Sequence, residues 1–319
     1  MWMWIAIVAV AAALALVKVY DRKVPGSLYK GVLLIWAVGP LVGTIWAMVL
    51  LWRDWIAPID LALFLVLYFL TGMGITGGFH RLITHSSFET NPVVRGAFLI
   101  LGCMAAQGRP IDWASNHLKH HAHADQEGDP HSPVEGLFHS HMGWFFSGEP
   151  ADRERYGSKL TRDPLTAFID KTTVLWLVLG LVIPYLIAGW SGFLWGGLVR
   201  IAFLNHATFA VNSICHAFGA RPFDTKDESR NNWIVALLTF GEGWHNNHHA
   251  FPAMAYHGMS WRQFDATALT IRFLVWLKLA KNVKLPRPEL VQRRLADPSA
   301  APSVAAATAA ATSQGQSAD

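Results

Sequence analysis

The chain has 319 residues, of which 52% are hydrophobic and only 15% are charged. This composition, with a mean hydropathy of +0.28, is too apolar for an ordinary soluble domain and indicates a protein whose solvent is the bilayer. The net charge of +4 arises from basic residues spread through the loops, which is typical of membrane orientation signals and argues against a nucleic-acid partner.

Uncharged runs of about 20 residues predict membrane-spanning helices. The run from Trp2 to Val17 predicts an N-terminal hydrophobic helix. Gly31 to Trp52 and Leu61 to Phe79 predict the first two core spans. Gly96 to Gly108 is too short to span, so we predict an interfacial or packed helix there.

The next apolar run, Thr172 to Val199, is too long for one span. It predicts the end of one helix, a tight turn at Gly189 to Gly192, and a second helix that continues to about Asn212. Arg200 lies within that second helix, and we expect it to snorkel or to be paired inside the protein. The runs together predict an all-α integral membrane protein with four core transmembrane helices.

Loop charges predict the orientation of these helices. Four basic residues follow the first run, whereas only Arg53 lies between the next two, so the first loop is expected in the cytoplasm. Counting crossings from that loop places the stretches after Phe79 and Asn212 in the cytoplasm as a helical cap. The chain then divides into a hydrophobic anchor with a basic loop (1–30), a membrane domain (31–296) and a disordered tail (297–319).

Eight of the 15 histidines fall into three tight clusters. Residues three and four apart share a helix face, so the second and third clusters are each expected to point one way. His80 and His85 are five apart, which predicts either a helix end or bend between them or two different metals. Eight imidazoles exceed what one zinc ion binds, so we predict two metals. The clusters are His80 and His85; His117, His120 and His121; and His245, His248 and His249.

These clusters resemble the three histidine boxes of the membrane acyl-CoA desaturase family. The matching motifs are HRLITH from His80, HLKHH from His117 and GEGWHNNHHAFP from Gly241, and the resemblance covers roughly Gly31 to Pro252. It implies two iron ions bound by nine histidines, with His216 as the ninth and Asn212 holding one iron through water. It also implies a substrate tunnel near Gln107, Trp113 and Thr208 whose blind end lies near Tyr68 and Gly72.

The chemistry implied by the resemblance is dioxygen-dependent introduction of a cis double bond, at the delta-9 position, into a long saturated acyl chain. A redox metal is required because an unactivated C–H bond offers no acidic proton. We expect Glu242, Asp125 and Asp129 to orient the imidazoles, and an external donor, a ferredoxin or a cytochrome b5-like protein, to supply electrons.

The acyl carrier stays open in the sequence. Ser115 and Asn116 stand where animal acyl-CoA desaturases have Arg-Asp, although Arg109 and Lys119 lie nearby. An acyl-CoA, an acyl carrier protein or a glycerolipid therefore each remain candidate carriers.

Two alternative functions are open: a di-iron hydroxylase or ketolase, and more remotely a metal transporter. The Gly72-x-Gly74-x-x-Gly77 pattern fits a dinucleotide fingerprint but lies in a predicted membrane helix, so it is expected to pack helices. Cys103 and Cys215 are expected to be buried and unpaired. The other histidines are predicted to be structural: His123, His131, His139, His141, His206 and His257.

Overall fold

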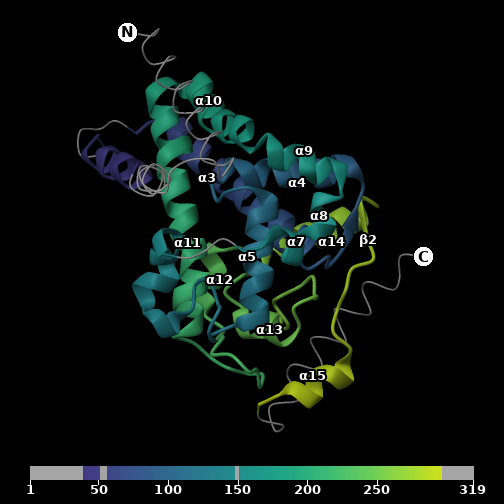
Figure 1. The fold of residues 1–319 in the computed structure, drawn as a ribbon. Coiled ribbons are helices and arrows are strands. Elements are labelled where there is room, and N and C mark those ends of the chain that lie inside the picture. The colour runs from purple at the N-terminus through teal and green to yellow at the C-terminus, as the bar shows by residue number, and fades with distance from the viewer. Residues whose placement is uncertain (1–38, 51–55, 148–150, 297–319) are drawn as a thin grey trace.

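The structure is a computed structural model that describes residues 39–50, 56–147 and 151–296. Within these ranges the secondary-structure elements that the loops connect are all helices apart from one short antiparallel pair of strands, β1 (Glu89–Thr90) with β2 (Ala280–Lys281). The predicted helix at Trp2 to Val17 and the predicted tail lie outside the described residues. Figure 1 shows the elements named below.

One long helix carries the first candidate span. α3 (Pro58–Met73) starts at a proline, and Asp60 accepts a hydrogen bond from the Ala57 N–H at 3.0 Å, which satisfies one of the free amides of the first turn. The helix runs on without interruption as the π-helix η1 (Gly74–Thr84), and the combined 27 residues are long and apolar enough to cross a bilayer. The sequence predicted this helix three residues late, at Leu61.

A second apolar run, Thr173–His216, contains the predicted turn. α10 (Thr173–Gly192) loses helical geometry at Ala188 and Gly189, and Gly189 has a φ of +60° that favours glycine. The chain returns as η4 (Phe193–Val199), α11 (Arg200–Ser213) and η5 (Ile214–His216), which pack back against α10.

These two runs are the candidate spans in the described part of the chain. Three apolar helices there are shorter: Gly39–Leu50, α4 (Pro92–Met104) and α14 (Ala266–Trp276). The short length of α4 agrees with the prediction for Gly96 to Gly108. The spans support membrane association, whereas the four-span count remains a prediction.

Arg200 is fully buried and paired inside the protein, as one of the two predicted alternatives requires. Its guanidinium donates to the carbonyl oxygens of Gly196 at 3.0 Å, Met104 at 2.6 Å and Gly180 at 3.2 Å. The Arg200 side chain therefore links α11 to α4 and α10 in the buried interior of the helices.

The glycine pattern at the start of η1 packs helices, as expected. A Cβ at Gly74 would overlap the Gly102 backbone of α4, and one at Gly77 would meet the Phe98 ring. The two cysteines, Cys103 and Cys215, are buried and free.

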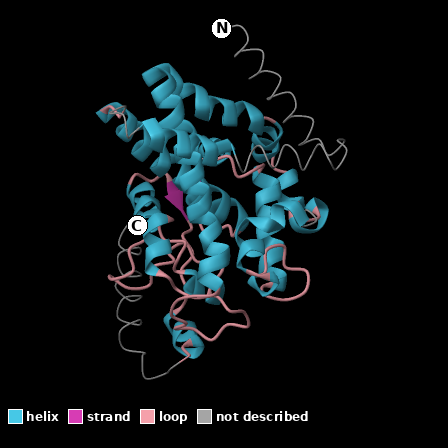
Figure 2. Ribbon diagram, turned by 90° about the vertical axis from the view of Figure 1, so that its left-hand side faces the viewer, coloured by secondary structure: helices cyan, strands magenta, loops and turns pink. Residues whose placement is uncertain are grey.

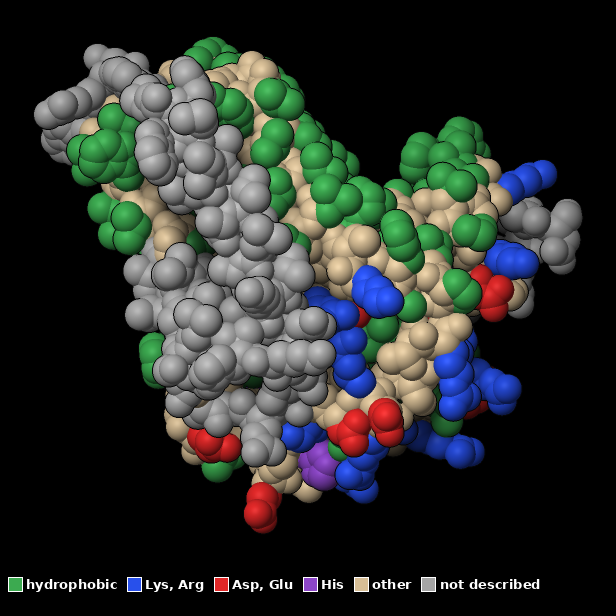
Figure 3. Space-filling view, turned by 45° about the horizontal axis from the view of Figure 1, so that its top comes forward, with side chains coloured by type: hydrophobic (Ala, Val, Ile, Leu, Met, Phe, Trp, Pro, Cys, Tyr) green, Lys and Arg blue, Asp and Glu red, His purple; other side chains and the backbone are tan. Residues whose placement is uncertain are grey.

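Long loops join short helices in the lower part of the molecule (Figure 2). Charged side chains gather on that part and hydrophobic ones cover the upper part (Figure 3). The remaining elements of the described chain are α5 (Pro110–His123), η2 (Pro133–Glu135), η3 (His139–Gly143), α6 (Trp144–Ser147), α7 (Arg153–Tyr156), α8 (Ser158–Thr161), α9 (Pro164–Lys171), α12 (Trp233–Leu238), α13 (His245–Ala250) and α15 (Pro288–Arg294).

Candidate metal centre

Five histidines from η1, the residue that directly follows it, α5 and α13 form the first cluster, and their ligand atoms all lie within 4.8 Å of one another. Adjacent Nε2 atoms are 2.9–3.1 Å apart. Two nitrogens bound at right angles to one metal, with bonds of about 2.1 Å, would be roughly 3.0 Å apart. Cluster one consists of His80, His85, His117, His121 and His248.

Four more histidines form the second cluster next to the first. The Nε2 atoms of His245 and His216 are 3.0 Å apart, and all four members are buried. Cluster two consists of His120, His216, His245 and His249.

The grouping differs from the expectation that each box points one way. His117 and His121 join cluster one, whereas His120 joins cluster two. The third box divides in the same manner, because His248 joins cluster one and the other two join cluster two. Each of these boxes therefore contributes to both clusters.

Four carboxylates hold the outer ring nitrogens. The Nδ1 atoms of His80 and His120 lie 2.5 Å from Glu242 and 2.9 Å from Asp129. Such contacts fix the ring orientation and leave Nε2 as the lone pair that faces the cluster. The other two pairs are His216 with Asp125 at 2.9 Å and His249 with Asp227 at 2.8 Å.

Glu242, Asp125 and Asp129 were expected in this role, and Asp227 was missed. It lies in the loop before α12, 22 residues before its histidine, and no spacing rule links the two. Glu242 is further held by Arg81 at 2.9 Å, and Arg81 also pairs with Asp265 at 3.0 Å. Burial opposes the charge of Glu242, but His257, Arg81 and His80 outweigh it and hold its pKa well below its usual range.

The arrangement of the histidine Nε2 atoms is better explained by a bound cation than by hydrogen bonds between the rings. The Nε2 of His121 faces both His117 and His248, yet one ring nitrogen offers one in-plane lone pair or one proton. The buried Nε2 atoms of His120 and His249 have no hydrogen-bond partner among the described residues. A metal ion in each cluster would satisfy these lone pairs.

Burial also keeps the rings in the form that binds metal. Desolvation, followed by repulsion from neighbouring histidines, holds the pKa of His85, His121 and His249 well below 6.5. The same causes lower the pKa of His117, His245 and His248. Neutral imidazoles are therefore present at neutral pH.

The predicted tunnel residues lie in two groups. Trp113 donates to Gln107 at 3.2 Å, Gln107 donates to Thr208 at 2.7 Å, and the Trp113 ring stacks on His117 with centroids 5.2 Å apart. Tyr68 and Gly72 both lie against Phe240, a residue that the sequence did not single out. The structure thus places one group beside cluster one and the other on α3.

Three other predicted features lie outside the clusters or beside them. Asn212 lies one helical turn before His216, and its water-mediated role remains a prediction. His131 and His257 were predicted to be structural, and their rings lie 4.4 Å from His120 and 4.6 Å from His248. His123 contacts Tyr156 at 3.4 Å instead.

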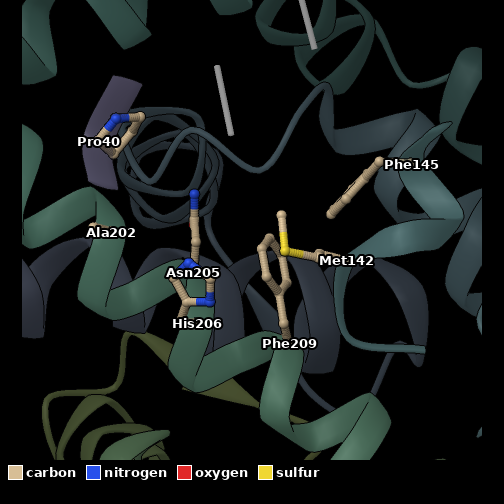
Figure 4. Close-up of a pocket in the computed structure, with 7 residues that line it drawn as sticks. All are labelled: Pro40, Met142, Phe145, Ala202, Asn205, His206 and Phe209. Carbon is tan, nitrogen blue, oxygen red and sulfur yellow. The ribbon is translucent and has the colours of Figure 1, made fainter. Parts of the chain in front are cut away.

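His141 and His206 form a histidine pair that is separate from both clusters, and their ring nitrogens are 3.0 Å apart. His206 lines a small pocket beside α11, where Met142 and Phe145 approach the α11 side chains (Figure 4). None of the predicted site residues lines this pocket, whose lining is Pro40, Met142, Phe145, Ala202, Asn205, His206 and Phe209.

Comparison with known proteins points to one family. The family model described as "Fatty acid desaturase" matches residues 55–270. The chain is 45% identical over 225 residues to an sn-1 stearoyl-lipid 9-desaturase of Anabaena variabilis, covering 69% of this chain and 82% of the relative. It is 38% identical over 282 residues to a hex-5-enoyl-[acyl-carrier protein] acetylenase of Moorena producens, covering 82% and 88%. An icosanoyl-CoA 5-desaturase of Limnanthes douglasii is 42% identical over 229 residues, covering 70% and 64%.

Proposed function

Because the chain belongs to the fatty acid desaturase family, and is thus a fatty acyl desaturase, we propose that it binds two irons and places a cis delta-9 double bond in a long saturated acyl chain. The observation that carries this proposal is the convergence of nine histidines into two adjacent clusters. The net reaction consumes one acyl chain, dioxygen, two electrons and two protons, and yields the alkene and two waters.

The residues divide the work as follows. Two irons bound in the clusters would activate dioxygen, which is the oxidant that removes two hydrogens from adjacent carbons. Cluster one and cluster two would hold them, with Asn212 holding one through water. The four outer carboxylates keep the rings aimed inward.

The acyl chain would lie beside cluster one. Trp113 stacks on His117 and donates a hydrogen bond to Gln107, which in turn donates to Thr208. These linked side chains would line the tunnel next to the reacting carbons. Tyr68 and Gly72 would form the blind end. Positioning by these side chains, and not acid–base chemistry, would select the carbons.

The relatives' names specify a lipid-linked, a carrier-protein-linked and a CoA-linked chain, so all three are candidate substrates. Electrons would come from a ferredoxin or cytochrome b5-like protein. The protein would cross the bilayer with four core helices and carry the clusters on its cytoplasmic side.

Expression in a host without desaturases tests the proposal. Total fatty acids should contain a new cis double bond at delta-9, and the iron-loaded protein should hold two irons per chain. His120→Ala should abolish the product, whereas His123→Ala, which alters a histidine outside both clusters, should retain it. A hydroxylated or acetylenic main product, or product from His120→Ala, would contradict the proposal.

A further inference from the structure

The first candidate span, α3 with η1, becomes fully buried by other elements before it is long enough to cross the hydrocarbon layer. The 18 residue-to-residue steps from Pro58 to Thr76 cover roughly 27 Å of helix, against a hydrocarbon layer of about 30 Å. Val66, Phe69 and Leu70 are still exposed, yet every residue from Thr71 to Thr84 is buried. Other elements must therefore face the lipid at this depth.

α14 lies at that depth. The hydroxyl groups of Thr267 and Thr76 are 2.7 Å apart, and Thr270 donates to the Met73 sulfur at 3.4 Å. One face of α14 packs into the core through Ala268 and Ile271. The opposite face exposes four apolar side chains with helical spacing: Leu269 (53%), Phe273 (56%), Trp276 (74%) and Leu277 (42%).

α12 lies deeper along the same span. The Tyr68 hydroxyl donates to the Leu238 carbonyl at 2.9 Å, about ten residues after Pro58. The segment from Trp233 to Gly241 has no charged residue, although it belongs to the part of the chain expected in the cytoplasm. Its exposed side chains are Trp233 (65%), Ile234 (51%), Leu237 (55%) and Leu238 (49%).

The two helices form one surface. The Thr267 N–H of α14 donates to the Phe240 carbonyl that follows α12, and the Phe240 ring packs on Phe69 of α3. The exposed faces of α12 and α14 thus continue the exposed face of α3. Lys278, Lys281 and Lys284 follow α14 directly and are exposed, which suits anionic headgroups at the edge of such a surface.

We propose that α12 and α14 are immersed in the leaflet on the metal side of the bilayer, with their exposed faces against lipid acyl chains and the three lysines at the phosphate level. This inference rests on the membrane topology in the proposed function. It places His80, four residues after Thr76, just above the hydrocarbon, so an acyl chain would reach cluster one without leaving the leaflet.

Site-directed spin labelling of the full chain in phosphatidylcholine and phosphatidylglycerol vesicles tests the inference. Labels at Trp276→Cys and Trp233→Cys should collide with dioxygen, which partitions into hydrocarbon, far more than with a water-soluble nickel chelate. Val66→Cys on α3 is the lipid control and Leu290→Cys on α15 the aqueous control. Cys103 and Cys215 are fully buried, so the parent chain should take up little label.

The outcomes separate the two ideas. Lipid-like values for α12 and α14, matching Val66→Cys, support the inference. Water-like values there with a lipid-like Val66→Cys overturn it and leave the membrane span intact. Labels shielded from both reagents overturn it in favour of a covering protein, and a water-like Val66→Cys overturns the topology as well.

Discussion

His85 lies one π-helical turn after His80. Its backbone N–H donates to the His80 carbonyl at 3.1 Å, and the two rings are 4.8 Å apart. In an α-helix, five residues would separate the rings by roughly 140°. The i→i+5 hydrogen bonding of η1 brings both rings into cluster one, so the structure groups the two histidines together and does not divide them between the two clusters.

Loss of His85 should therefore affect one cluster. His85→Ala removes a nitrogen 3.1 Å from that of His117 and touches no ring nitrogen of cluster two. We expect the purified variant to retain about half the metal of the parent chain and no desaturase activity. Metal analysis by mass spectrometry checks this, and complete retention or complete loss of metal would show that the clusters do not load independently.

Asp227 should strengthen metal binding although it contacts only the outer ring nitrogen of His249 and none of the ring nitrogens that face the clusters. Asp227→Asn removes the charge that holds His249 at 2.8 Å, and the loss of such a partner typically lowers metal affinity or activity about 10–100-fold. Chelator competition measures the affinity. The matched control is Asp224→Asn, an exposed carboxylate of the same loop, which should behave as the parent; equal effects of both changes would rule out a specific role for Asp227.

Acid should destabilise the metal-free protein below about pH 6.5. Six cluster histidines have folded-state pKa values well below 6.5, so the unfolded chain takes up protons first as the pH falls. The stability they contribute is complete above pH 6.5 and is lost below it, by up to about 1.4 kcal/mol per pH unit for each histidine. The pKa of Glu242 is also lowered, so the stability that this carboxylate contributes is present above its unfolded value of 4.5 and is lost only at more acid pH.

Thermal unfolding in detergent between pH 8 and pH 5 measures this effect. The midpoint should be flat at high pH and fall below pH 6.5. A midpoint that is unchanged at pH 5 would show that the rings are not buried as neutral groups.

Gly72 and Phe240 should control acyl chain length together. A Cβ at Gly72 would overlap the Phe240 ring, so Gly72→Trp should shift the products to shorter chains. Phe240→Ala should make room and partly reverse that shift in the double variant. Gas chromatography of the products checks both, with Gly96→Ala as a control because its Cβ would meet only ordinary contacts. An unchanged profile in all variants would place the blind end elsewhere.

Arg200 should be a stability residue. Arg200→Met leaves three buried carbonyls without their donor, and each unsatisfied group costs about 1–3 kcal/mol. The melting temperature should fall clearly, whereas Arg162→Met, at an exposed position, should leave it unchanged. A stable Arg200→Met variant with altered products would instead assign Arg200 to the substrate path.

The sequence by itself determined the helical class, the turn inside the run from Thr172 and eight of the nine clustered histidines, because apolar run length and motif spacing are local properties. The ninth, His216, followed only from the resemblance to the desaturase family. Only the tertiary structure decided how the boxes divide between two clusters, because this depends on where α5 and α13 place their histidines relative to those of η1 and η5. The π-helical winding of η1 and the Asp227 contact also lay beyond sequence reasoning, since packing and a distant loop set them. Helix periodicity places side chains on a face, but the neighbouring helices decide what that face meets.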